Sequence, residues 1–300
     1  MNILITGSNG FLGNYICDAF NEKKVAFDTI GRNSSNNIIF DFEKDNNLIL
    51  KNQYSSVVHV AGKAHFVPKN EAEIASFNKI NVEGTKVLLK AFENQINLKQ
   101  FVFISSIAVY GLSEGNLIDE NYELEAKDPY GSSKILAEKI ITDWCKNKGI
   151  SFYVLRLPLI IGNNAPGNLG AMLNGIKNNR YARIGNGHAK KSMVLAKDIA
   201  DLIKNIEGES GIYNLTDGYH PSFKELGDKI GKFYHKKIIT IPNIIAIFLA
   251  KVGDLMGNKA PINSLKLKKI TSQLTFSDEK ARRHLNWNPN KVLESWKLQK

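Results

Sequence analysis

The chain reveals its fold in residues 6–13, Thr6-Gly7-Ser8-Asn9-Gly10-Phe11-Leu12-Gly13, which directly follow a short apolar run. The apolar run is typical of a buried strand, and residues 14–22 after the glycines favour a helix. In this order, the first glycine permits a tight turn, the second lets the backbone approach a pyrophosphate, and the third lets the helix pack against the strand. A helix N-terminus also offers free N–H groups to phosphate. The stretch therefore predicts a dinucleotide-binding unit.

A second pattern, Tyr130-Gly131-Ser132-Ser133-Lys134, places a phenol and an ammonium four residues apart. On a helix these two side chains share one face. A free tyrosine loses its proton near pH ~10, and an adjacent positive charge lowers that pKa by stabilising the phenolate. Such a pair can exchange a proton with a hydroxyl or carbonyl group. The pattern also occurs by chance on solvated helix faces, so its meaning depends on the rest of the chain.

Apolar runs alternate with helical stretches up to about residue 162, which predicts an α/β fold with a doubly wound parallel sheet of the Rossmann type. Strands are expected near residues 2–6, 25–30, 37–41, 56–61, 100–105 and 151–157. The predicted dinucleotide-binding domain comprises 1–162 with a returning segment near 190–216, which includes an edge strand at 211–215. Residues 163–189 and 217–300 are expected to form a smaller C-terminal substrate-binding domain over the carboxyl ends of the strands.

Composition limits the class of protein. Three hundred residues with 43% hydrophobic content can form a large core. The only cysteines, Cys17 and Cys145, lie in expected helices, so we expect packing roles, no disulfide framework and a cytoplasmic location. The longest apolar region, 238–252, is interrupted by polar residues and is shorter than the ~20 residues that span a bilayer. It predicts a helix of the smaller domain or, as the alternative, a segment that lies against a membrane face.

The net charge of +11 suits either a nucleotide diphosphate or anionic lipid headgroups. No basic stripe interleaved with aromatic residues is found, which argues against a nucleic-acid partner.

Several further segments occur in the order typical of one family. These are Val57-Val58-His59-Val60-Ala61-Gly62, Asn81-Val82-Glu83-Gly84-Thr85, residues 103–111, residues 156–162 and residues 281–289. Together with residues 6–13 and 130–134, they make the chain resemble the extended short-chain dehydrogenase/reductases. Within this NAD-dependent epimerase/dehydratase family, the similarity is to nucleotide-sugar 4-epimerases and 4-ketoreductases, and it covers essentially the whole chain.

The resemblance implies a catalytic group of Ser106, Tyr130 and Lys134. Ser106 precedes Tyr110 by four residues, the place of the family's active-site serine, and its hydroxyl would orient the substrate oxygen towards Tyr130. Lys134 would hold the nicotinamide ribose and lower the pKa of the tyrosine. Ser105 is the alternative serine, because successive residues of a strand point to opposite faces.

The resemblance also predicts the cofactor site. Its residues are Gly7, Asn9, Gly10, Phe11, Leu12, Arg32, Asp41, Phe42, Val60, Ala61, Gly62, Asn81, Ser105, Tyr130, Lys134 and Leu157. An NAD site usually carries a carboxylate on the ribose 2′-hydroxyl at the end of the second strand. Gly31 stands there, followed by Arg32, whose guanidinium can bind a 2′-phosphate. We therefore expect NADP rather than NAD, while Asp41-Phe42 resembles the pair that contacts adenine.

The reaction is narrowed by the residues after the serine. Family 4,6-dehydratases carry an acidic pair there, whereas this chain has Ile107-Ala108, which disfavours dehydration. We expect NADP(H)-dependent reduction of the 4-keto group of a nucleotide-activated 6-deoxyhexosamine, for surface polysaccharide synthesis. The alternative is a UDP-N-acetylhexosamine or UDP-hexose 4-epimerase with tightly bound NAD. Reduction of a small ketone and a non-catalytic NADP-binding regulator are the remaining hypotheses.

Substrate contacts are expected from Lys63, His65, Ser106, Asn168, Lys191 and Arg282. Cationic residues in this set could neutralise a pyrophosphate. His59 and His65 have no accompanying carboxylate or thiol, so we expect no metal. The family also implies a homodimer formed through the helices that follow the fourth and fifth strands.

Overall fold

The central sheet contains seven parallel strands in the order β11-β7-β5-β4-β1-β2-β3. It is seen in a computed structural model that describes residues 2–64, 68–256, 260 and 262–299. The strands are β1 (Ile3–Thr6), β2 (Phe27–Gly31), β3 (Ile38–Ile39), β4 (Ser56–His59), β5 (Gln100–Ser106), β7 (Ser151–Leu157) and β11 (Gly211–Asn214). The order reverses between β1 and β4, where ligands of such sheets bind.

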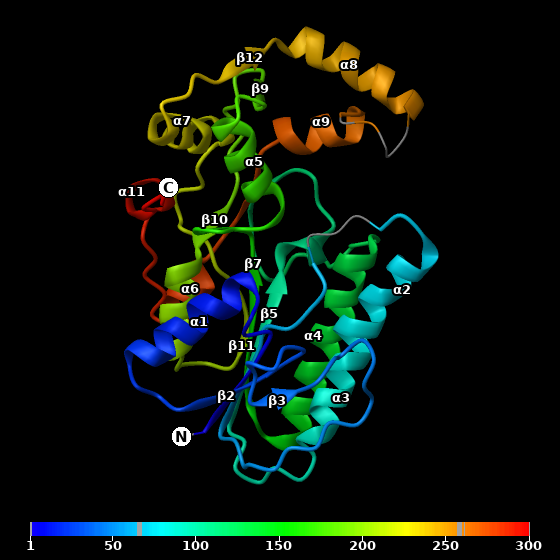
Figure 1. The fold of residues 1–300 in the computed structure, drawn as a ribbon, viewed down its shortest axis with the longest axis vertical. Helices are drawn as coiled ribbons and strands as arrows, with labels where there is room; N and C mark the ends of the chain where they lie inside the picture. Colours follow the sequence, from blue (N-terminus) through cyan, green and yellow to red (C-terminus); the bar gives the residue numbers. More distant parts are fainter. Residues whose placement is uncertain (1, 65–67, 257–259, 261, 300) are drawn as a thin grey trace.

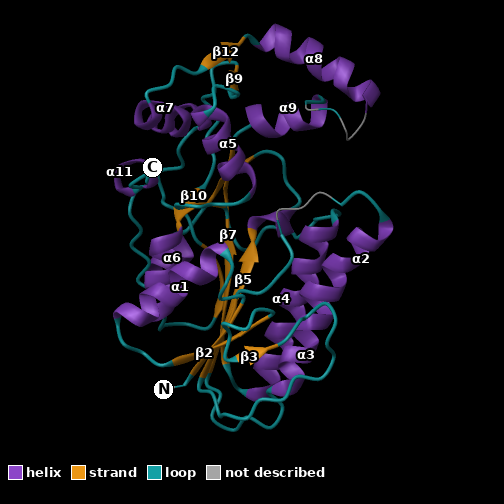
Figure 2. Ribbon diagram, viewed as in Figure 1, coloured by secondary structure: helices purple, strands orange, loops and turns teal. Residues whose placement is uncertain are grey.

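Helices cover both faces of this sheet (Figures 1 and 2). One face carries α1 (Phe11–Glu22) and α6 (Ala196–Lys204), and the other carries α3 (Gly84–Ala91) and α4 (Pro129–Lys148). On the first face, Ile16 of α1 and Ile199 of α6 are buried against the sheet because their apolar sides face it. On the second, α2 (Glu71–Asn78) and the π-helix η1 (Lys79–Glu83) precede α3. The α/β Rossmann-type prediction is confirmed.

The first turn of α4 is fixed by local sequence. Asp128 is the N-cap residue and accepts a hydrogen bond from the Gly131 N–H at 3.0 Å. Pro129 occupies the first helical turn, where its missing N–H costs nothing. Gly149 ends the helix in the left-handed conformation at φ +66°. These signals set the orientation of Tyr130 and Lys134, which lie on the first two turns.

The remaining elements are built over the carboxyl ends of the strands (Figure 1). The helices there are α5 (Gly167–Lys177), α7 (Phe223–Tyr234), α8 (Asn243–Met256) and α9 (Ser264–Thr271). Three parallel strand pairs join the region: β8 (Leu159–Ile161) with β10 (Met193–Leu195), β9 (Ala182–Ile184) with β12 (Ile239–Ile241), and β6 (Gly115–Ile118) with β13 (Leu274–Phe276). Leu169 and Met172 of α5 are buried with Leu226 and Ile230 of α7, so this region has an apolar core of its own.

A C-terminal tail crosses back to the sheet. It contains α10 (Glu279–His284) and α11 (Val292–Ser295). The Trp287 indole N–H donates to the Thr216 carbonyl at 3.0 Å, and the Val292 N–H donates to the Asp217 carboxylate at 3.1 Å. Asn290 donates to Asp198 on α6 from both its backbone and its side chain. The tail thereby ties the segment after β11 to α6.

The apolar region 238–252 forms β12 and most of α8. Throughout the described ranges, every helix is too short or too polar to cross a membrane.

Candidate active site

The turn after β1 approaches the neighbouring strand closely. Gly7 has φ +71°, and a Cβ there would lie 2.6 Å from the Ala61 backbone nitrogen. At Gly13, on the first turn of α1, a Cβ would lie 2.1 Å from the Gly7 carbonyl oxygen. Both contacts are far inside van der Waals distance, so only glycine allows this geometry. The N-terminus of α1 therefore lies open at the sheet, where an anion can approach its N–H groups.

A cleft of about 750 Å³ begins at this turn and runs to the first turn of α4. Nearly all of the predicted cofactor residues line it. They are Gly7, Asn9, Gly10, Phe11, Leu12, Arg32, Asp41, Phe42, Val60, Ala61, Gly62, Ser105, Tyr130, Lys134 and Leu157. Such a volume is in the usual range for cofactor pockets. Because the cleft joins a phosphate-binding turn to a tyrosine and a lysine, the residues present fit a dinucleotide.

Asn81 is outside the lining but fixes the shape of the cleft. It lies in the π-helix η1, an irregularity that is frequent at functional sites. Its side-chain oxygen accepts from the Lys63 N–H at 2.7 Å, and its amide donates to the Lys63 carbonyl at 3.1 Å. The amide also donates to the Ser133 hydroxyl of α4 at 2.9 Å. Asn81 thereby links the segment after β4 to α4.

The end of β2 differs from a carboxylate-bearing site. A Cβ on Gly31 would lie 2.8 Å from the Asn36 side-chain nitrogen, so Asn36 occupies the adjacent space. Asn36 is buried, accepts from the Ser8 hydroxyl at 2.7 Å and donates to the Asn9 side chain at 2.8 Å. The loop after β2 is therefore bound to the glycine turn. Arg32 lines the same part of the cleft.

Ser106 and Tyr130 meet at the other end of the cleft. Ser106 is the last residue of β5, and its hydroxyl also accepts from the Ala108 N–H at 3.2 Å. Burial raises the pKa of Tyr130, and a hydrogen bond with Ser106 opposes that rise. Ser105 instead donates to the buried Glu138 carboxylate. Because successive residues of a strand point to opposite faces, Ser106 faces Tyr130 and Ser105 faces Glu138.

Lys134 lies beneath the cleft with its ammonium held by the sheet. It donates to the Ile104 carbonyl at 2.8 Å and lies 4.5 Å from the centre of the Phe103 ring. Burial lowers the pKa of Lys134 to about 8, and the negative charge of Glu138 opposes the shift. The expected lowering of the Tyr130 pKa by this ammonium is not found: burial, with a smaller effect of the Asp128 charge, raises that pKa, and the opposing effect comes from Ser106.

The family model described as the NAD dependent epimerase/dehydratase family matches residues 3–215. The chain belongs to this family. The predicted resemblance is therefore confirmed, together with the NAD(P)-dependent enzyme class it implied.

The chain is similar to two relatives of known sequence and to one solved structure. N-acetyl-alpha-D-glucosaminyl-diphospho-ditrans,octacis-undecaprenol 4-epimerase of Escherichia coli O157:H7 is 28% identical over 213 residues, covering 67% of this chain but only 64% of that protein. UDP-glucose 4-epimerase of Vibrio cholerae is 25% identical, covering 98% of this chain and 92% of that protein. UDP-glucose 4-epimerase of Thermotoga maritima, solved with UDP-glucose, shares the fold with a TM-score of 0.74 at 19% identity, over 98% and 96% of the two chains.

A buried ion pair between Arg156 and Glu138 lies below the cleft, and the sequence analysis did not predict it. Arg156 of β7 donates to both oxygens of Glu138 at 2.7–3.2 Å, and its other nitrogen donates to the Tyr110 hydroxyl at 3.0 Å. The two charged side chains are only 2% and 4% exposed. Glu138 follows Lys134 by one helical turn, so the spacing Lys-x-x-x-Glu was the available signal.

The predicted substrate residues separate into two groups. Lys63, Ser106 and Asn168 line the cleft, and the Lys63 ammonium donates to Ser76 at 2.6 Å. His65 lies outside the described residues. Lys191 and Arg282 are not among the described residues that line the cleft, so the structure does not bring them to the site.

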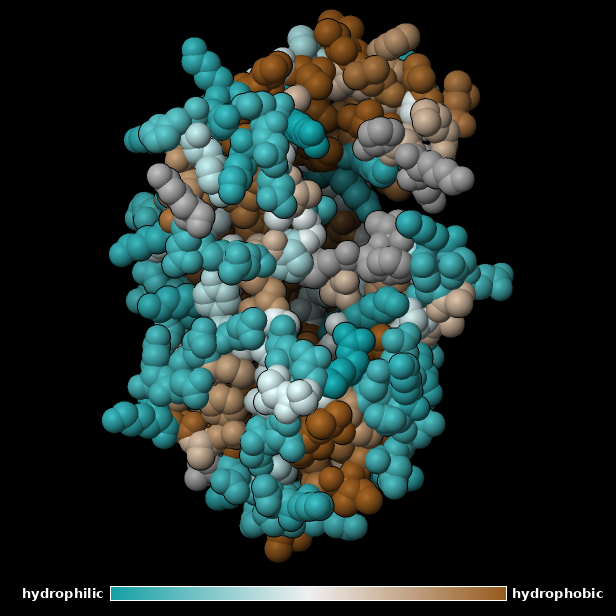
Figure 3. Space-filling view, in the orientation of Figure 1, coloured by the Kyte–Doolittle hydropathy of each residue, from teal (hydrophilic) through white to brown (hydrophobic). Residues whose placement is uncertain are grey.

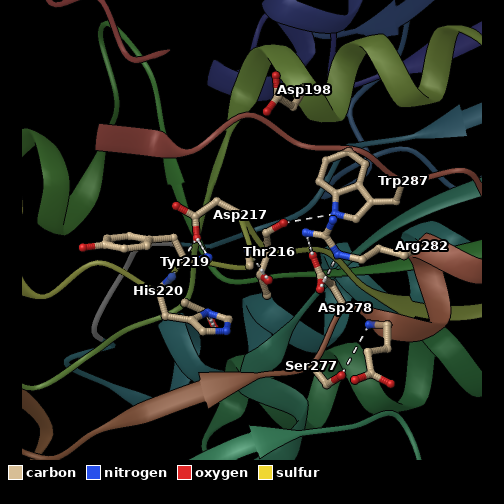
Figure 4. A network of polar contacts seen from close by, with 12 residues as sticks. Asp198, Thr216, Asp217, Tyr219, His220, Ser277, Asp278, Arg282 and Trp287 are labelled. Carbon is tan, nitrogen blue, oxygen red and sulfur yellow. Dashed lines mark hydrogen bonds and ion pairs between the residues drawn. The ribbon is translucent and has the colours of Figure 1, made fainter. Parts of the chain in front are cut away.

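Arg282 forms an ion pair at the protein surface instead. Its guanidinium donates to both oxygens of Asp278 at 3.0 Å, close to Trp287 and the segment after β11 (Figure 4). A Cβ on Gly218 would lie 2.6 Å from the same guanidinium. Lys191 is half-buried next to β13, and that burial lowers its pKa to about 8. Arg282 thus pairs with a neighbouring carboxylate, and Lys191 is half-buried beside β13.

His59 lies in the core below the cleft. Its two ring nitrogens lie 2.7 Å from the Thr6 hydroxyl and 3.1 Å from the Thr85 hydroxyl. Burial, with a smaller effect of the Lys134 charge, lowers the pKa of His59 to about 3. The ring is thus neutral and bonded on both sides, which is typical of a core histidine.

Proposed function

We propose that this protein is a 4-epimerase of a diphosphate-activated hexose or N-acetylhexosamine that keeps a nicotinamide cofactor bound through the reaction. The presence of Ser106, Tyr130 and Lys134 in the same cleft as the glycine turn carries the proposal. Ile107 and Ala108 follow the serine, so the acid and base that elimination of water needs are missing there. The 4-epimerase names of the relatives further support epimerisation over the ketoreduction that the sequence favoured.

The residues of the chain supply proton transfer and placement. In the first half, the Tyr130 oxygen takes the proton of the sugar 4-hydroxyl while Ser106 holds that oxygen by a hydrogen bond. A nicotinamide cofactor held along the cleft from Gly10 to Lys134 would supply the hydride chemistry at C4. In the second half, Tyr130 returns the proton to the sugar oxygen after the sugar has turned its other face.

Lys134 makes the proton transfer possible. Its ammonium lies on the floor of the cleft, where burial has already lowered its pKa to about 8. A cationic Lys134 stabilises negative charge on the Tyr130 oxygen once a ligand excludes water from the cleft, because charges interact more strongly in a dry site. Catalytic hydrogen bonds often tighten only when ligands bind, which is compatible with the Lys134 bond to Ile104 seen here.

A second candidate is the NADP(H)-dependent reduction of a 4-keto-6-deoxyhexosamine. One observation favours it: Arg32 lines the cleft next to Gly31 and Asn36, with no carboxylate on the Gly31 position. A 2′-phosphate would meet a guanidinium there and no negative charge from residue 31. Cofactor identity therefore separates the two candidates, because a reductase exchanges NADPH for NADP in every turnover and an epimerase retains its cofactor.

The test begins with purified protein. Its bound dinucleotide is released by denaturation and identified chromatographically. The native protein is then incubated with UDP-N-acetylglucosamine or UDP-glucose, and the C4 epimer is measured by NMR. We expect retained NAD and epimer formation without added cofactor. NADPH consumption with a UDP-4-keto-6-deoxy-N-acetylhexosamine, and no epimer, would replace the epimerase by the reductase.

The matched variants are Tyr130→Phe and Tyr122→Phe. Tyr130→Phe removes the proton-transfer group but keeps the ring, so we expect cofactor retention with turnover lowered about 10²–10⁴-fold. Tyr122 is an exposed tyrosine whose replacement should leave turnover unchanged. Turnover of simple ketones without a nucleotide sugar would favour the small-ketone hypothesis. A predicted homodimer through α3 and α4 is testable on the same sample by light scattering.

A further inference from the structure

Helix α8 packs on the protein through its small residues. Ala246, Ala250 and Gly253 are its buried positions, and they recur at the spacing of one helix face. A Cβ on Gly253 would lie 1.9 Å from the Ile262 carbonyl oxygen, so the helix backbone touches the following segment. The side of α8 that faces the protein therefore holds almost no apolar side-chain volume.

The large apolar side chains of α8 point the other way. Ile244, Phe248 and Leu255 are 82%, 67% and 90% exposed, and Ile245, Val252 and Met256 are also exposed. At 3.6 residues per turn these six positions fall within an arc of about 120°. We call these six residues the α8 face. Figure 3 shows it as the large hydrophobic area over α8. A water-exposed helix normally has the opposite arrangement, so the α8 face requires an apolar environment.

Lysines are more frequent than acidic residues in α8, α9 and the segment between them. Residues 243–271 contain five lysines and one acidic residue, Asp254. That carboxylate accepts hydrogen bonds from the Ser264 N–H at 2.9 Å and the Ser264 hydroxyl at 2.6 Å, at the start of α9. On α9, a helix with no buried residue, Lys268 forms an ion pair with Glu114 at 3.0 Å, whereas no ion pair is found for Lys269 among the described residues. An apolar helix face with lysines beside it is the arrangement of a segment bound at the surface of an anionic membrane.

Other occupants fit less well. Two copies that met through this face about a two-fold axis would bring their lysine-rich α9 segments together, which like charges oppose. Insertion across a bilayer is excluded by length, because α8 has 14 residues and a span needs about 20. A helix lying in the membrane plane needs neither a partner of opposite charge nor more length.

We propose that the protein binds anionic lipid bilayers through the α8 face, with α8 lying in the headgroup region and Lys251 and Lys269 near the lipid phosphates. The α8 face buries its apolar side chains at the boundary of headgroups and acyl chains. Lys251 and Lys269 add attraction to anionic headgroups, which salt weakens. This binding is independent of the sugar that the cleft accepts.

The test is vesicle flotation of the full chain. One set of vesicles contains phosphatidylcholine alone, and a second contains phosphatidylcholine with about one third phosphatidylglycerol. We expect the protein to float with the anionic vesicles and to lose part of this binding as salt is raised. The variant Phe248→Glu/Leu255→Glu should bind at least about tenfold more weakly, because two buried apolar side chains are replaced by anions.

Two controls separate this site from unspecific attraction of a basic protein. Ile96→Glu changes a residue that is 90% exposed in the loop before β5, away from α8, and should float like the wild type. Circular dichroism confirms that each variant is folded. Equal flotation of the α8 variant and the wild type would show unspecific charge binding and overturn the proposal. Absence of flotation, with a wild-type dimer that the α8 variant converts to monomer, would assign the face to a second copy instead.

Discussion

Removing the negative charge of Glu138 tests how the buried ion pair supports the site. In Glu138→Gln, the side chain keeps its shape but can no longer accept three charged hydrogen bonds from Arg156. Its amide N–H₂ would face the guanidinium, and Arg156 would remain charged at 2% exposure. The attraction between the two charges compensates for their removal from water, so a buried charge without its partner destabilises the folded state.

The expected cost is large for a single atom exchange. Breaking a buried pair by removing one partner costs about 3–5 kcal/mol. At roughly 2.1 cal/mol/K per residue, a chain of 300 residues has an unfolding entropy near 0.6 kcal/mol/K, so the melting temperature should fall by about 5–8 °C. The same change removes the charge that supports the ammonium of Lys134, so the pKa of Lys134 should fall further.

Differential scanning calorimetry measures the first effect, and the pH profile of turnover measures the second. Glu83→Gln is the matched control, because its ion pair with Lys86 is about half exposed and should change stability by less than about 1 kcal/mol. Glu138→Leu/Arg156→Met removes both charges and should melt above Glu138→Gln. A Glu138→Gln protein that melts within a degree of the wild type, or a double variant that is worse than the single one, would refute this reasoning.

Three further outcomes follow from the site. Burial lowers the pKa of His59 to about 3, so below pH 6.5 the unfolded chain binds a proton at His59 that the folded chain does not bind. The free energy of unfolding should therefore decrease between pH 6.5 and 3, by an amount on the order of 4–5 kcal/mol. Thermal melts of His59→Asn over the same pH range should not show this decrease. Gly13→Ala would drive its Cβ into the Gly7 carbonyl and should abolish copurification of the cofactor, whereas Gly149→Ala meets no atom and should cost only about 1–2 kcal/mol of melting stability. Arg32→Ser should weaken NADP binding about tenfold in a fluorescence titration and leave NAD unchanged; equal effects on both would show that Arg32 does not read the 2′-position.

Local geometry explains which parts of the fold were predictable. Residues 6–13 and 130–134 each carry their conformation in short-range spacing, so the turn, the helix and the shared face follow from sequence. The strand positions of the sheet also follow, because buried parallel strands are continuous apolar runs. The order of those strands and the approach of the two segments to one cleft then depend on a known family pattern.

Tertiary context explains what the sequence left open. The pKa of Tyr130 depends on how deeply it is buried, and no spacing of Tyr and Lys reveals that depth. Arg282 had an alternative partner in Asp278, four residues before it, and the choice between that carboxylate and a substrate is made by packing. The apolar run 238–252 indicated a helix, but the side of α8 that touches the protein is decided by the segment after it.

The position of β11 has a consequence for synthesis. Strand β7 ends at residue 157, and the strand that covers its outer edge begins only at residue 211. A ribosome must therefore add residues 158–210 while the N–H and C=O groups of that edge have no partner. An open strand edge is a template for pairing with another chain. During that interval the nascent chain presents an open edge, while the region above the sheet is already emerging and the sheet itself is unfinished.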